Sequence, residues 1–187
     1  MNAQRSSLKG ERWLERPETE AVLRALITAG HEARVVGGAV RNSLIGLPVT
    51  DVDIATTATP EAVVAAAGKA GLKSVPTGID HGTVTVIANH IPFEVTTLRE
   101  DVETDGRHAK VRFGTNWIKD ASRRDFTINA IYCGADGTIF DPLGGVSDAL
   151  ARRIRFIGRA KDRIAEDYLR ILRYFRFYAQ YGENGLD

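Results

Sequence analysis

Apolar residues recur at helical spacing near both ends of this chain, and they alternate with polar residues in its middle. The apolar stripe at 22–27 predicts an amphipathic helix that Pro17 begins and Gly30 ends. Alternation over 83–87 and again over 93–98 predicts two strands. The other elements predicted before residue 99 are strand 32–36, helix 40–45, strand 49–56 and helix 59–71.

The pattern changes at residue 99. Residues 99–114 are charged and lack a period, which predicts a mobile loop. Helices alternating with strands before this point indicate an α/β (α+β) fold with a mixed sheet and flanking helices. We therefore predict a head at 1–145, followed at 146–187 by a helical segment. The elements predicted after the loop are helix 126–132, strands 138–140 and 153–157, and helix 161–181.

Composition narrows the possible functions only slightly. The 187 residues are 43% hydrophobic and 26% charged, as in ordinary globular proteins. A net charge of +1 gives no overall attraction for nucleic acid, so any RNA contact requires local clustering of charge. The single cysteine, Cys133, excludes an internal disulfide framework and fits a reducing compartment. With no signal peptide and no membrane span expected, a cytoplasmic location is predicted.

Gly37 and Gly38 join a predicted strand to a predicted helix. Glycines allow a phosphate to approach the backbone, and a helix N-terminus offers N–H groups and a positive dipole. Arg41, in the first turn, is placed to add a charge-assisted hydrogen bond to the same anion. The alternative is that two glycines only make a tight turn.

Asp51 and Asp53 follow this turn, two residues apart on a predicted strand. Residues i and i+2 of a strand point to the same face, and two carboxylates there repel unless a cation lies between them. Mg²⁺ binds one or two carboxylates and completes its shell with phosphates and water. Glu94, on a neighbouring strand, is a candidate third carboxylate. The alternative is a strand end with solvated acids.

Two basic segments follow in the second half of the chain. Asp125 is placed to cap the helix predicted at 126–132, which leaves Arg123 or Arg124 to reach phosphates or ribose. On the last predicted helix, Asp167 lies at the edge of a basic face formed by Arg170, Arg173 and Arg176. The opposite, apolar face is expected to enter the core, and it contains Tyr168, Ile171, Leu172, Phe175 and Ala179.

Asp167 and Arg170 are three residues apart, so they are neighbours on a helix surface. An acceptor beside a donor matches an amino group beside a bare ring nitrogen, which cytosine and adenine both present. Guanine and uracil present the reverse pattern, and a mismatch of this kind can discriminate by roughly 10⁴-fold or more. The alternative is a solvated charged face.

Five blocks follow one another over most of residues 35–178. They are VGGAVR at 36–41, DVD at 51–53, RRDFTINA at 123–130, FDPLGG at 140–145 and EDYLRILR at 166–173. In this order they resemble the class II tRNA nucleotidyltransferase and bacterial poly(A) polymerase family, which has a polymerase-β-like head. The segment PTGIDHGT at 76–83 resembles the sequences of the CCA-adding branch of this family.

The resemblance implies roles for individual residues. Asp51 and Asp53 would be catalytic and hold Mg²⁺, while Gly38 and Arg41 would hold the triphosphate. It further implies that 100–111 is a flexible loop linked to the switch from C to A addition. The remaining implied nucleotide-binding residues are Arg124 for ribose and phosphates, and Asp167, Arg170, Arg173 and Arg176 for the incoming base.

The chain departs from the family pattern in two ways. The family usually has aspartate where this chain has Asn42, which removes a charge. Family members also continue through a helical neck, body and tail that grip tRNA, whereas this chain stops at Asp187. The resemblance therefore implies that 146–187 is the beginning of an all-helical neck domain. We therefore expect Tyr174, Phe177 or Tyr181 to be exposed on the last helix and to drive self-association.

The expected function is template-independent addition of CMP and AMP, from CTP and ATP, to the 3′ end of tRNA. The RNA 3′-hydroxyl would attack the α-phosphate in a Mg²⁺-dependent reaction. Three alternatives remain: a poly(A) polymerase with the same head, a nucleotide-binding module without turnover, and a metal-dependent phosphohydrolase. The last would need a histidine cluster, and the four histidines are scattered along the sequence.

Overall fold

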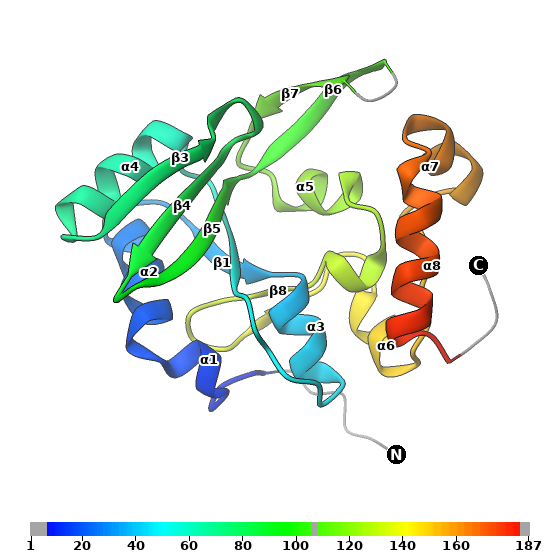
Figure 1. The fold of residues 1–187 in the computed structure, drawn as a ribbon, viewed down its shortest axis with the longest axis horizontal. Coiled ribbons are helices and arrows are strands. Elements are labelled where there is room, and N and C mark those ends of the chain that lie inside the picture. Colours follow the sequence, from blue (N-terminus) through cyan, green and yellow to red (C-terminus); the bar gives the residue numbers. More distant parts are fainter. Residues whose placement is uncertain (1–6, 106–107, 184–187) are drawn as a thin grey trace.

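A computed structural model describes residues 7–105 and 108–183. Within them, the central feature is a seven-stranded mixed sheet in the order β3-β4-β5-β2-β1-β8-β9 (Figure 1). Strands β2 and β5 pair in parallel, and the other neighbours are antiparallel. The strands are β1 Ala33–Val36, β2 Asp53–Thr56, β3 Lys73–Gly78, β4 Thr83–Ala88, β5 Ile91–Thr97, β8 Tyr132–Cys133 and β9 Ile139–Phe140. The predicted mixed α/β architecture is confirmed.

Helices flank this sheet, and α2 and α4 lie far from α7 and α8 in Figure 1. Helix α2 begins at Pro17, as predicted, and Thr59 caps α4 by accepting a hydrogen bond from the Ala62 N–H at 3.3 Å. The helices are α1 Arg12–Glu15, α2 Pro17–Thr28, α3 Gly38–Leu44, α4 Pro60–Lys69, α5 Trp117–Arg123, α6 Gly145–Leu150, α7 Ala160–Glu166 and α8 Leu169–Tyr181.

Alternation along the strands creates a core on each face of the sheet. Val35 and Ile54 are cross-strand partners and are buried in the larger core, which also receives α2 and α4. Val36 and Ala55 point the other way, into a smaller core with Trp117. Because side chains alternate, Asp53 shares the second face with its cross-strand partner Val36. This register places Asp53 directly beside the Gly37 turn.

The prediction of a mobile loop at 99–114 is wrong for most of that segment. Strands β6 (Arg99–Asp105) and β7 (His108–Phe113) pair as an antiparallel hairpin that projects from the sheet (Figure 1). Glu100 lies opposite Arg112 and forms an ion pair with it at 3.1 Å. Because the strands are paired through charged residues, their sequence lacks the alternation of apolar and polar residues that predicts a strand. Residues 106 and 107 lie outside the described residues.

Several predicted element bounds also change. Strand β3 and helices α1, α5 and α6 were not predicted, and the predicted strand 153–157 is reduced to a single bridge between Phe156 and Phe126. The predicted helix 126–132 is only a 3₁₀ turn, Thr127–Asn129, followed by β8. The predicted helix 161–181 breaks at Asp167, whose φ of −156° and ψ of 107° are extended.

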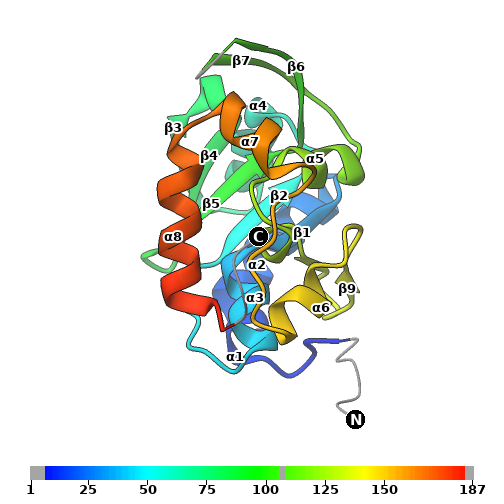
Figure 2. The same ribbon diagram turned by 90° about the vertical axis from the view of Figure 1, so that its right-hand side faces the viewer.

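The C-terminal helices pack against the head. Val146 of α6 and Tyr174 and Tyr181 of α8 are buried in the larger core cluster. Figure 2 shows α8 as a long straight helix beside the sheet, and α7 lies near the end of α5. The boundary between a head at 1–145 and a neck at 146–187 stays a prediction. Nowhere in the described part of the chain does a helix combine the length and apolar character needed to cross a bilayer.

Candidate active site

A cleft of about 750 Å³ lies between the sheet and α8. Its wall comes from six parts of the chain: the β1–α3 turn, the starts of β2 and β6, the middle of β5, residues 123–129 and the α7–α8 segment. The lining residues are Val36, Gly37, Gly38, Arg41, Asp53, Ile54, Glu94, Thr96, Arg99, Arg123, Arg124, Asp125, Asn129, Asp167, Leu169, Arg170, Arg173 and Phe177.

The glycine turn forms one end of this cleft. Gly37 has a φ of 71°, which a residue with a side chain rarely adopts, and it directly precedes α3. The Asn129 carbonyl oxygen lies 3.6 Å from the position of a Cβ at Gly37, an ordinary contact, so the positive φ rather than lack of space favours glycine there. The Gly37 N–H donates to Ile131 O at 3.1 Å, which ties the turn to the strand after the RRDFTINA block. The turn therefore exposes the backbone of Gly38 to the cleft.

The acidic side of the cleft is formed by Asp53, with Glu94 beside it on β5. Burial raises the pKa of Asp53 above its ordinary value, and the carboxylates of Glu94 and Asp51 raise it further, against the pull of Arg124. Asp53 is exposed to the cleft, so the cleft walls desolvate its carboxylate only in part. The arrangement concentrates negative charge at one point.

Asp51 differs from its predicted placement. It precedes β2 rather than lying on it, is exposed, and accepts a hydrogen bond from the Thr50 hydroxyl at 2.9 Å. It lies close enough to Asp53 to affect its pKa, but it is not among the residues that line the cleft. Within the described ranges, no three or more His, Cys, Asp or Glu side chains gather closely enough to hold a metal. Any cation here would depend on the aspartate pair and on ligands from outside the chain.

Arg124 reaches the cleft from the end of α5. Asp120, four residues earlier on the same helix, accepts hydrogen bonds from Arg124 Nε at 3.1 Å and from Nη2 at 2.9 Å. The Tyr132 hydroxyl donates to the same Asp120 oxygen at 2.9 Å. Sequence reasoning missed Asp120, although an acid four residues before an arginine on a helix is a recognisable signal. Arg123 also pairs with Asp120 at 3.1 Å.

Arg41 lines the cleft but is almost completely buried, with 6% of its surface exposed. It makes four hydrogen bonds, two to Asn42 Oδ1, one to Asn129 Oδ1 and one to the Tyr181 hydroxyl. A guanidinium has five N–H groups, so at most one remains for a phosphate. Asn42, the departure from the family pattern, is therefore a partner of Arg41, and its amide also donates to Pro48 O at 2.7 Å.

The proposed base-recognising pair lies at the break between α7 and α8. Asp167 Oδ1 accepts from the Leu169 N–H at 3.0 Å, so this carboxylate caps α8. Arg170 donates to Glu166 Oε2 at 2.6 Å and to Arg163 O at 2.8 Å. Both Asp167 and Arg170 line the cleft, as predicted. Arg163 in turn holds α7 to the end of α5 by donating to the carbonyls of residues 123 and 124.

Arg173 lines the cleft too, and it forms an ion pair with Asp125. Asp125 was predicted to cap a helix; it accepts the Phe126 N–H at 2.8 Å and the Asn129 amide at 2.9 Å instead. Arg176 is not among the lining residues, and its guanidinium lies 5.5 Å from the Phe177 ring centre.

The predicted orientation of the last helix is wrong. Tyr168, Leu172 and Phe175 were expected in the core but are 73%, 68% and 56% exposed. Tyr174 and Tyr181, which were expected to be exposed, are buried, and Phe177 is half-buried. Tyr174 and Phe177 pack on the Phe126 ring, with ring centres 5.9 and 5.4 Å apart, so the second aromatic stripe enters the core. The half-exposed ion pair between Arg173 and Asp125 accompanies this packing.

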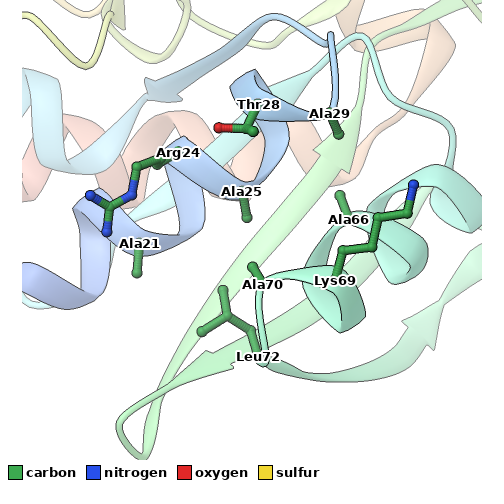
Figure 3. A pocket seen from close by; sticks show the side chains of 9 residues that line it. All are labelled: Ala21, Arg24, Ala25, Thr28, Ala29, Ala66, Lys69, Ala70 and Leu72. Atoms are coloured by element: carbon green, nitrogen blue, oxygen red, sulfur yellow. The ribbon is translucent and has the colours of Figure 1, made fainter.

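A second hollow lies on the far side of the sheet, between α2 and α4. Figure 3 shows small side chains facing one another there, with Arg24 and Lys69 at the edges and Leu72 nearby. Its lining contains no carboxylate and none of the predicted site residues. The chemistry-bearing residues are therefore gathered in the first cleft.

Comparison with known proteins identifies the family of this chain and its relatives. Residues 33–155 match the family model described as the Poly A polymerase head domain. CCA tRNA nucleotidyltransferase 1, mitochondrial, from Mus musculus is 54% identical over 151 residues, which are 80% of this chain and 35% of that protein.

Two solved structures resemble the fold. The Bacillus stearothermophilus CCA-adding enzyme in complex with CTP is 41% identical with a TM-score of 0.78, over 87% of this chain and 39% of that one. A tRNA nucleotidyltransferase complexed with a primer tRNA and an incoming ATP analog is 30% identical with a TM-score of 0.67, over 84% and 44%. The chain thus spans less than half the length of these relatives. Since the family model covers most of the chain and all but the last of the five sequence blocks, this protein belongs to the Poly A polymerase head domain family.

Proposed function

We propose that this chain is the catalytic head of a nucleotidyltransferase that adds CMP and AMP, from CTP and ATP, to the 3′ end of tRNA. The observation that carries the proposal is the cleft itself. It brings Gly38, Asp53 and Arg124 together with Asp167 and Arg170, although these residues span more than 130 positions of the sequence. Phosphate-binding, acidic and base-reading groups then face one volume large enough for a nucleotide.

The triphosphate is assigned to the glycine turn and Arg124. Gly38 presents backbone without a side chain, and Asp120 orients the Arg124 guanidinium toward the cleft. A planar guanidinium held in this way recognises phosphate oxygens in a defined direction. Arg41 contributes at most one further donor, for the reason given above.

The base is assigned to Asp167 and Arg170. Asp167 uses one oxygen to cap α8, so its other oxygen is placed to accept from the amino group of cytosine or adenine. Arg170 would donate to the adjacent ring nitrogen. Glu166 and the Arg163 carbonyl hold Arg170 in place before a nucleotide arrives. Arg173 assists from the next turn of α8; Arg176, outside the cleft lining, is assigned a weaker supporting role.

Mg²⁺ fits the acidic side of the cleft. The raised pKa of Asp53 reflects burial and two neighbouring carboxylates, which is the charge arrangement a divalent cation relieves. Asp51 and Asp53 would hold the ion, and Glu94 is near enough to influence it. When bound, Mg²⁺ supplies charge for activating a hydroxyl and stabilising pyrophosphate. The chain's own contribution is to hold the α-phosphate between this acid pair and Arg124.

The 3′ end of tRNA is the proposed acceptor. The name of the Mus musculus relative and the primer tRNA in the solved neighbour support it. A cytoplasmic location also belongs to the proposal, because a single cysteine fits a reducing compartment. The Mus musculus relative is named mitochondrial, a compartment that one cysteine does not exclude.

Self-association is the last part of the proposal, through a face other than the one first expected. Helix α8 exposes Tyr168, Leu172 and Phe175 on one side. Exposed apolar patches of this kind promote association. Leu172→Glu should shift a concentration-dependent sedimentation profile toward the monomer, whereas a profile identical to that of the unchanged protein would remove this assignment.

A nucleotide-incorporation assay tests the function. A tRNA lacking its terminal CCA is incubated with the chain and Mg²⁺, with CTP and ATP supplied separately and together. The proposal expects CMP addition from CTP, and AMP only after it, with both lost in the double variant Asp51→Asn and Asp53→Asn. Long tails from ATP alone would favour a poly(A) polymerase. CTP binding without incorporation would favour a binding module.

A further inference from the structure

A closed ring of hydrogen bonds joins α8 to the head at two places. Arg173 Nε donates to Asp125 Oδ2 at 2.9 Å, and the other oxygen of Asp125 accepts from Asn129 Nδ2 at 2.9 Å. Asn129 Oδ1 accepts from Arg41 Nη1 at 2.6 Å, and Arg41 Nη2 donates to the Tyr181 hydroxyl at 2.8 Å. Tyr181 is on α8 again, so the ring begins and ends on the same helix.

The ring encloses an aromatic centre. The Arg41 guanidinium lies 4.1 Å from the Tyr181 ring centre and 5.4 Å from that of Phe177. Arg173 lies 5.7 Å from the Phe177 ring centre on the other side. Tyr181 is 7% exposed, so its hydroxyl and the Arg41 donor are withdrawn from water. Buried polar groups that are all satisfied within one network rigidify the contact they span.

The distance along α8 between Arg173 and Tyr181 affects how firmly the helix is oriented on the head. Arg173 and Tyr181 are eight residues apart, which on a helix is roughly 12 Å at 1.5 Å per residue. Between these points Tyr174 and Phe177 pack on the Phe126 ring, and the hydrogen bonds on either side add directional contacts that fix the orientation of α8 on this packing. Arg170, one turn before Arg173, then has a defined position relative to the glycine turn from which α3 and Arg41 begin.

We propose that Arg41 and Tyr181 are positioning residues whose hydrogen bond docks α8 on α3, and thereby sets base-reading Arg170 at a fixed distance from the triphosphate. This inference rests on the proposed function. It assigns Arg41 a role distinct from direct phosphate binding. It also gives Tyr181, which no sequence motif indicated, a part in base selection.

Equilibrium binding provides the test. Affinities for CTP, ATP, UTP and GTP are measured by calorimetry with Mg²⁺ for the unchanged protein, for Tyr181→Phe and for Arg41→Lys. Tyr181→Phe keeps the ring and removes only the hydroxyl. Its discrimination against UTP and GTP should fall about tenfold, the equivalent of one lost buried hydrogen bond. Arg41→Lys keeps the positive charge but removes the planar guanidinium and its several N–H donors. Its discrimination against UTP and GTP should fall by the same factor. The double variant should be no worse than either single one.

Tyr168→Phe is the matched control, because Tyr168 is 73% exposed and makes no contribution to the ring. It should retain the full discrimination. A lower melting temperature of Tyr181→Phe with unchanged discrimination would show a merely structural bond and overturn the inference. So would Arg41→Lys with normal discrimination. If the unchanged protein does not prefer CTP and ATP, the proposed function fails first, and this inference fails with it.

Discussion

Asp120 holds Arg124 from inside the protein: one carboxylate oxygen accepts from both Nε and Nη2 of the guanidinium, at 3.1 and 2.9 Å. Asp120 is 1% exposed, and Arg124 extends from it to the cleft wall. The same carboxylate binds Arg123 and the Tyr132 hydroxyl, and its Oδ1 accepts from the Arg99 N–H at 3.4 Å. One buried acid therefore links the base of the β6–β7 hairpin to an arginine of the cleft wall.

Removing this carboxylate should be strongly destabilising. Asp120→Ala leaves the Arg124 charge without its partner, and breaking a buried pair in this way typically costs about 3–5 kcal/mol. The free energy of unfolding in urea, followed by the fluorescence of Trp117 beside Tyr132, measures the loss. Glu15→Gln, on the exposed surface of α1, is the control and should change little. A loss below about 0.5 kcal/mol, as for surface substitutions, would contradict this role for Asp120.

The stabilisation by Asp120 should depend on pH. Burial alone would raise the pKa of Asp120, but the charges of Arg124 and Arg123 and the hydrogen bonds from Arg124 and Tyr132 outweigh it and lower the pKa. A carboxyl with a lowered folded-state pKa contributes stability above its unfolded pKa of about 3.9. That contribution is lost as pH falls through the folded value. The stability gap to Asp120→Asn should be full at neutral pH and shrink in acid; a constant gap would contradict the pairing.

The charge of Asp53, unlike that of Asp120, should destabilise the folded protein. Burial, Glu94 and Asp51 raise its pKa, so its charged form is unfavourable in the folded protein at neutral pH when no cation is present. Asp53→Asn should therefore raise the melting temperature in EDTA. Adding Mg²⁺ should raise the melting temperature of the unchanged protein and leave that of the variant unaltered. A variant that melts lower than the unchanged protein in EDTA would show that the carboxylate is not under electrostatic strain.

Asp167 has two functions that a pair of variants can separate. Its carboxylate caps α8 through the Leu169 N–H and, in the proposed function, accepts from the base. Asp167→Ala should lose both, with about 1 kcal/mol of stability for the cap. Asp167→Ser should restore most of the stability but not the preference for CTP over UTP in binding. Recovery of that preference in Asp167→Ser would assign base selection to another group.

Most of the predicted site residues line the cleft, although Asp51 and Arg176 do not. Alternation along β1 and β2 determines which side chains share a face, and strand register then brings Asp53 beside Val36 and the glycine turn. Helical spacing alone could also have revealed Asp120 from Arg124. These are local or periodic relationships, which a single sequence displays directly.

The orientation of α8 and the β6–β7 hairpin could not be obtained in the same way. Helix α8 carries two overlapping aromatic stripes, one through Leu172 and Phe175 and one through Tyr174 and Tyr181. Spacing does not decide between them. The packing of Tyr174 and Phe177 on Phe126, which is far away in the sequence, does. The hairpin is held by pairs such as Glu100 with Arg112, which look like a solvated loop in sequence.

The most direct test is a crystal structure of this chain with CTP and Mg²⁺. The triphosphate should lie against Gly38 and Arg124, the ion between Asp51 and Asp53, and the cytosine edge at Asp167 and Arg170. A nucleotide bound outside the cleft, or one whose base points away from the start of α8, would contradict the account.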